Sequence, residues 1–144
     1  MKKYLSMVLC CLLVISLFGA PAYAALPGTD GINQSDYFIC YGTNLSRQGG
    51  GTLLITFSTT GVGLCDVLGV ATFQIQCWDE NGEHWYDITA DIPGETGTNV
   101  ATYNFSRYFY GTAGRKYRVC VTFICAKYGM GVETKPYNSP AIVA

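Results

Sequence analysis

Histidines and closely spaced cysteines, from which many catalytic and metal sites are built, are scarce in this sequence. His84 is the only histidine among 144 residues, and no two cysteines stand at Cys-x-x-Cys spacing. Structural zinc sites use such ligands, so we expect neither a metal nor a cofactor. Charged residues make up only 13% of the chain, with a net charge of −1. Because a nucleic-acid partner would need a basic face, we expect none.

A recognisable nucleophile is also missing. There is no Gly-x-Ser-x-Gly motif, and His84 stands beside a turn. Carboxylates between residues 79 and 91 could serve a small hydrolase, but acidic side chains at a turn usually serve solubility. A calcium loop from Asp79 fails, because Ala90 stands at its twelfth position. We therefore expect a protein that is not an enzyme. The acids considered are Asp79, Glu80, Glu83, Asp87 and Asp91.

Helical periodicity is absent after the first 24 residues, which have the three parts of a secretory signal. Lys2 and Lys3 precede an apolar run over residues 5–18, and Ala22 and Ala24 are the small residues of a cleavage site. The run is shorter than the ~18 residues of a spanning helix. No second apolar run follows, so no stable membrane anchor is expected. The sequence predicts a signal-peptide helix and a secreted, extracellular protein.

The domain organisation follows from this processing site. Cleavage after residue 24 would leave 120 residues, enough for one domain. Loss of Lys2 and Lys3 would leave seven basic and ten acidic side chains, a net charge of about −3. Residues 25–35 contain Pro27 and two glycines and are expected to form a flexible leader. The folded domain is expected to span residues 36–144.

Short strands separated by turn residues fill that domain. Alternation is most regular over residues 115–127, where Tyr117 and Val119 face one side and Arg118 the other. Residues 61–68 are expected to form a loop or a short crossing segment. About seven strands favour an all-β fold, an antiparallel sandwich. The expected strands cover residues 37–41, 52–60, 70–79, 83–92, 99–107 and 115–127 and part of 131–136, with a few more residues after Pro140.

A hairpin with two tryptophans is the clearest local pattern. Asn81-Gly82 predicts a two-residue type I′ turn, because both of its residues need positive φ. In that register Trp78 faces Trp85 and Cys77 faces Tyr86. The two indoles would then form an exposed cross-strand pair on the solvated face. A bulge would instead turn one strand over and bury at least one indole in the core. Both alternatives stay open at this point.

The same register fixes the rest of the hairpin. It places Phe73 opposite Ala90, and it also brings Glu80 opposite Glu83, a like-charge pair that hints at a longer turn. One face of the hairpin is apolar and is expected to join the core. Its residues are Phe73, Ile75, Cys77, Tyr86, Ile88 and Ala90.

The C-terminal third carries a resemblance to known proteins. Residues 111–123 contain the pattern Gly-x-x-Tyr-Arg, and Glu133-Thr134-Lys135 follows in a thin strand. This arrangement is similar to a broad group of short proteins exported by Firmicutes, especially gut Clostridia. Residues 64–70 resemble the segment before that group's central hairpin. The group has no established activity, so the resemblance implies a fold and secretion alone.

Tyr117 opens a strand after a glycine-rich stretch, which resembles the tyrosine corner of immunoglobulin-like sandwiches. Its hydroxyl is expected to bond to the backbone near Gly111 or Thr112. The antibody-type Cys–Trp–Cys core is missing, because residues 53–57 contain no cysteine. The sequence therefore predicts an immunoglobulin-like sandwich with core chemistry closer to fibronectin type III.

Five cysteines follow the signal, and an odd number leaves at least one unpaired. They are either small buried hydrophobes or partly paired in disulfides, as an exported chain allows. In an immunoglobulin-like sandwich, Cys65 and Cys125 should lie at the same end, so they are the pair expected to bridge if any does. Cys120 has the opposite parity to Tyr117 and should point away from the core. The five are Cys40, Cys65, Cys77, Cys120 and Cys125.

These observations favour a secreted, non-enzymatic binding or surface-interaction module. Its expected ligand is an extracellular carbohydrate or protein, held by Trp78 and Trp85 if both are exposed. One alternative is an assembly subunit that associates by a strand edge, for which residues 131–136 are the expected edge. The other is the small carboxylate hydrolase.

Overall fold

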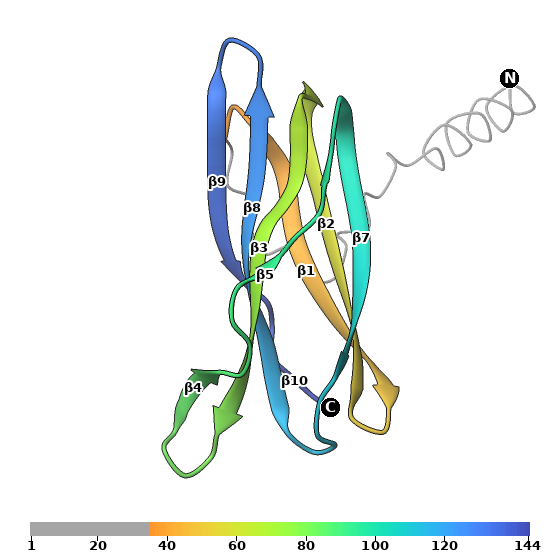
Figure 1. Cartoon of the computed structure of the whole chain (residues 1–144), viewed down its shortest axis with the longest axis vertical. Coiled ribbons are helices and arrows are strands. Elements are labelled where there is room, and N and C mark those ends of the chain that lie inside the picture. Colours follow the sequence, from red (N-terminus) through yellow and green to blue (C-terminus); the bar gives the residue numbers. More distant parts are fainter. Residues whose placement is uncertain (1–34) are drawn as a thin grey trace, which may run out of the picture.

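Two antiparallel β-sheets pack face to face in the computed structural model, which describes residues 35–144 (Figure 1). The expected signal peptide, its cleavage residues Ala22 and Ala24, and the leader up to residue 34 lie outside the described residues. No helix of the described part is long and apolar enough to cross a membrane. The strands of this part are β1 (Phe38–Gly49), β2 (Thr52–Cys65), β3 (Val67–Asp79), β4 (His84–Asp87), β5 (Ile92–Pro93), β6 (Thr96–Gly97), β7 (Val100–Tyr110), β8 (Lys116–Lys127), β9 (Gly131–Asn138) and β10 (Ile142–Val143).

The smaller sheet has the order β1-β2-β7. Leu53, Ile55 and Phe57 of β2 point inward and are buried, as their alternation predicts. The prediction of a loop or short crossing segment over residues 61–68 is wrong. β2 continues to Cys65, and only Asp66 separates it from β3. Its pairing with β7 shifts register between Thr60 and Cys65, so the glycines there form an irregularity within a strand.

The larger sheet has the path β10-β8-β3-β4, with β9 also paired to β8 and the short β5 and β6 paired to β3. β8 shows the predicted period of two, since Tyr117, Val119, Val121 and Phe123 are all buried. The last two elements match the strands expected near residues 131–136 and after residue 140.

Aromatic rings join the two sheets in one core. The ring centroid of Phe57 on β2 lies 4.9 Å from that of Phe73 on β3. The Phe57 ring is also stacked on Phe105 of β7, with the centroids 4.6 Å apart. Phe38, Phe57 and Phe123 are among the largest side chains that are fully buried. The all-β antiparallel sandwich is therefore confirmed.

The β3–β4 hairpin keeps the predicted register but not the predicted turn. Trp78 pairs with Trp85, and the last pair is Asp79 with His84, which leaves a four-residue loop. The two-residue type I′ turn is thus wrong. Within the loop, positive φ falls on Glu83 (49°) rather than on Gly82. The Asp79 carboxylate accepts a bond from the Asn81 amide at 3.1 Å and stabilises this longer turn.

The predicted core face of the hairpin holds on β3 alone. Phe73, Ile75 and Cys77 are buried, but Tyr86 and Ile88 are 37% and 38% exposed, and Ala90 is also exposed. β4 projects at one end of the sandwich, away from β7, so the smaller sheet does not cover it (Figure 1). The pairing of Phe73 with Ala90 is also wrong, because Phe73 pairs with Ile92 of β5.

Candidate functional site

The two tryptophans lie together on the outer face of the larger sheet. The ring centroids of Trp78 and Trp85 are 5.3 Å apart and the planes meet at 61°, an edge-to-face contact. Both side chains are partly exposed, so neither lies in the core and neither is fully solvated. This result falls between the exposed pair and the buried indole that the sequence left open.

Two cations from β8 lie against the indole pair. The Lys116 ammonium is 5.9 Å from the Trp78 ring centroid, and the Arg118 guanidinium carbon is 4.5 Å from the Trp85 centroid. Each contact is a cation–π interaction, which fixes the ring and adds positive potential beside it. The tryptophans and these cations form what we call the indole platform: Trp78, Trp85, Lys116 and Arg118.

A row of polar side chains crosses three strands next to the platform. The Arg118 Nε–H donates to Gln76 Oε1 at 2.7 Å, and Gln76 Nε2 donates to Asp87 Oδ1 at 2.7 Å. The three residues are register partners on β8, β3 and β4. The row therefore holds Arg118 over Trp85 and presents amide and carboxylate groups beside an aromatic surface.

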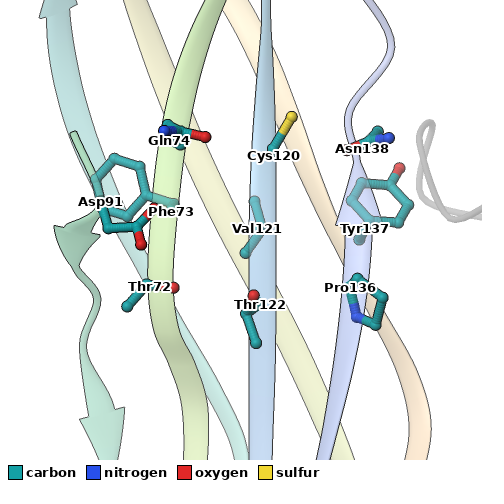
Figure 2. Close-up of a pocket in the computed structure, with 10 residues that line it drawn as sticks. All are labelled: Thr72, Phe73, Gln74, Asp91, Cys120, Val121, Thr122, Pro136, Tyr137 and Asn138. Carbon is teal, nitrogen blue, oxygen red and sulfur yellow. The ribbon is translucent and has the colours of Figure 1, made fainter. Parts of the chain in front are cut away.

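A shallow groove continues the same face toward β9 (Figure 2). Gln74, Cys120 and Asn138 lie level with one another on β3, β8 and β9, as their register requires. Asp91 closes one side of the groove, whose volume is about 140 Å³. Cys120 lines it and alternates with the buried Val119 and Val121, so its side chain points away from the core, and burial raises the pKa of its thiol. Polar side chains thus extend from the platform along the sheet.

Two of the acidic residues considered for hydrolysis, Asp79 and Asp87, help to build the hairpin. Asp79 holds its turn and Asp87 accepts from Gln76. Glu80, Glu83 and Asp91 are exposed. Among residues 35–144 no cluster of three or more His, Cys, Asp or Glu side chains is arranged to hold a metal ion.

The Tyr117 hydroxyl bonds to the backbone segment that the sequence predicts for it. The Thr112 amide donates to its hydroxyl at 2.8 Å, so the hydroxyl accepts rather than donates. The ring is 4% exposed and lies so close to Gly111 that a β-carbon there would be 2.8 Å from it. This contact ties the turn before β8 to the core.

Cys65 and Cys125 are in contact at the other end of β8. Their sulfur atoms are 2.9 Å apart, and both residues are completely buried. They lie at one end of the sandwich, where the sequence argument places them.

Lys116, Arg118, Gln76 and Asn138 were not singled out as site residues from the sequence. Their strand parity was readable, since Arg118 alternates with the buried Val119. What the sequence could not reveal is that β8 lies beside β3, some 40 residues away. That pairing alone brings Arg118 to Trp85.

Comparisons of the chain with protein-family models, curated proteins and solved structures found no match.

Proposed function

We propose that this protein is a non-enzymatic extracellular binding module that holds a glycan on the indole platform and the polar row beside it. The observation that carries the proposal is the edge-to-face Trp78–Trp85 pair on an outer sheet face, with Arg118 fixed over Trp85. Secretion enters the proposal from the sequence, through the signal pattern of residues 1–24.

The chemistry of a sugar fits these groups. A pyranose has an apolar C–H face, which can pack on an indole, and hydroxyls around its rim, which need hydrogen-bond partners. Indoles supply large contact area at low entropic cost, while Gln76 and Asp87 supply donors and acceptors at their edge. Lys116 and Arg118 add charge that favours sugars with carboxylate groups. A flat, shallow face suits a chain of sugars better than an enclosed small molecule.

Affinity electrophoresis tests this proposal. Gels containing neutral or uronic-acid polysaccharides should retard the wild-type protein, and Trp85→Ala should abolish the retardation. Tyr128→Ala is the matched control, because Tyr128 is a 97% exposed aromatic in the β8–β9 turn, away from the platform. Equal retardation of Trp85→Ala and wild type would contradict the proposed site.

A second candidate function, self-assembly, has support at the edge strand β7. Within the described residues β7 pairs with β2 alone, and nine successive pairs from Thr52–Tyr110 to Thr60–Thr102 run without a bulge. It contains no proline, and its one charged side chain is Arg107, which is paired with Glu95. The edge expected from the sequence, residues 131–136, is less suitable because β9 contains Pro136, which has no backbone N–H to donate to another strand.

Light scattering over a range of protein concentrations tests this second function. If β7 edges pair between two copies, the wild type becomes dimeric with rising concentration and Ser106→Lys does not. Asn44→Lys is the matched control, because Asn44 lies level with Ser106 on the opposite edge strand, both paired to Thr56. A wild type that stays monomeric would exclude assembly by this edge.

A further inference from the structure

We propose that Cys65 and Cys125 are joined by a disulfide that connects the two sheets when the chain folds in an oxidising compartment. Cys65 is the last residue of β2 in the smaller sheet, and Cys125 lies on β8 in the larger one. Their sulfur atoms are 2.9 Å apart, within the reach of a covalent bond after a small rotation of either side chain.

The packing around the two sulfurs selects this pair. Gly61 lies against the Cys65 sulfur so closely that any side chain there would collide with it. Apart from the contact between the two sulfurs, the acceptors for the thiols are the carbonyls of Gly63, 3.7 Å from Cys65, and of Tyr37, 3.8 Å from Cys125, and both are weak bonds for sulfur. A disulfide removes both S–H groups and needs no acceptors, so it suits this enclosed site better than two thiols.

The other cysteines of the described chain are placed elsewhere. Cys77 is buried near Tyr117, at the opposite end of the β3–β8 pair from Cys125. Cys120 lines the outer groove, and Cys40 is partly exposed on β1 of the smaller sheet. The odd number of cysteines is thereby explained, since one bridge leaves three thiols.

Bond formation requires an oxidant that carries a disulfide, either a thiol–disulfide oxidoreductase or a small-molecule disulfide. One cysteine, as thiolate, attacks the donor disulfide to give a mixed disulfide, and the second cysteine then displaces the donor sulfur. The pair loses two electrons and two protons, and the donor becomes a dithiol. Because burial raises the pKa of Cys125 to about 12, the folded pair is poorly reactive. Exchange therefore happens while the chain is still folding.

Non-reducing peptide mapping tests this inference independently of any ligand. The protein is refolded in a glutathione redox buffer, its free thiols are alkylated under denaturing conditions, and the digest is analysed by mass spectrometry. We expect the Cys65 peptide linked to the Cys125 peptide, at the summed mass less two hydrogen atoms. Cys120→Ser, on the same strand, should keep this link.

The wild-type map also decides the inference if a cysteine variant fails to fold. A dominant link that uses Cys40, Cys77 or Cys120 would overturn it, and so would alkylation of both Cys65 and Cys125 after oxidative refolding. A further expected result is that the native oxidised protein keeps its bond in reductant until denaturant is added, since both sulfurs are inaccessible. Rapid reduction of the native protein would contradict the assigned buried pair.

Discussion

Trp78 and Trp85 meet edge to face across the β3–β4 pair, with their ring centroids 5.3 Å apart, in the register that the sequence predicts. Three side chains of the outer face are linked to this contact, because Arg118 lies over Trp85 and the row through Gln76 to Asp87 holds Arg118 in place. The platform is therefore assembled from three strands. It should behave as one unit when any member is changed.

A double-mutant cycle measures the contact between the indoles. Trp78→Ala, Trp85→Ala and the double variant are compared by denaturant unfolding. Edge-to-face aromatic pairs add about 0.5–1.5 kcal/mol beyond the area they bury, so we expect a coupling free energy in that range. Additive effects of the two single substitutions would show that the rings do not interact in solution.

The corner tyrosine gives a second test. Tyr117→Phe removes the acceptor for the Thr112 amide and should lower the free energy of unfolding by about 1 kcal/mol, at the low end for a lost hydrogen bond because Thr112 is itself exposed. Tyr110→Phe, at a 78% exposed tyrosine, is the control and should change little. An unchanged denaturation midpoint for Tyr117→Phe would show that the bond between its hydroxyl and the Thr112 amide does not stabilise the fold.

Reduction of the proposed disulfide should lower the free energy of unfolding. The bridge would close a loop of 60 residues, and the chain-entropy relation gives roughly 4 kcal/mol of stabilisation for a loop of that length. We expect the oxidised protein to unfold at clearly higher denaturant concentration than the reduced protein. Identical midpoints in the two redox states would contradict a bridge at this site.

The reduced protein should also lose stability at alkaline pH. The pKa of Cys125 is raised in the folded chain by burial and by the neighbouring Cys65, from 9.0 to about 12. The unfolded chain then releases a proton that the folded chain retains, so this contribution is intact below pH 9 and is lost as the pH rises toward 12. Unfolding curves of the reduced and oxidised proteins should therefore diverge in this window, because only the reduced chain carries the thiol. Parallel pH profiles would refute the assignment.

The sequence predicted the parts of the fold that depend on local alternation. The buried faces of β2 and β8 follow from a period of two. The Trp78–Trp85 register follows from the position of Asn81-Gly82, although the turn itself is longer than predicted. The prediction of a loop over residues 61–68 failed because Gly61 and Gly63 are typical of a loop. In the structure these glycines lie within β2, at a shift in its register, and Gly61 leaves room for the Cys65 sulfur. Burial of Tyr86 was predicted wrongly because alternation indicates a face but not whether another sheet covers it.

The site was less predictable than the fold. The indole pair is local, but Arg118 reaches Trp85 only because β8 pairs with β3, a long-range contact with no signal in a single sequence. The immunoglobulin-like character and the resemblance to exported Firmicutes proteins stay predictions. The structure does contain the expected bond between the Tyr117 hydroxyl and the backbone of Thr112, in which the amide is the donor.

Fluorescence titration tests the binding face most directly, because Trp78 and Trp85 are the only two tryptophans in the chain. All tryptophan emission therefore reports on the indole platform. Titration with a polysaccharide that retards the protein in a gel should give a saturable change in emission, and Arg118→Ala should weaken the apparent affinity. Retention of polysaccharide binding with no change in tryptophan emission would contradict the account, since the ligand would then lie elsewhere.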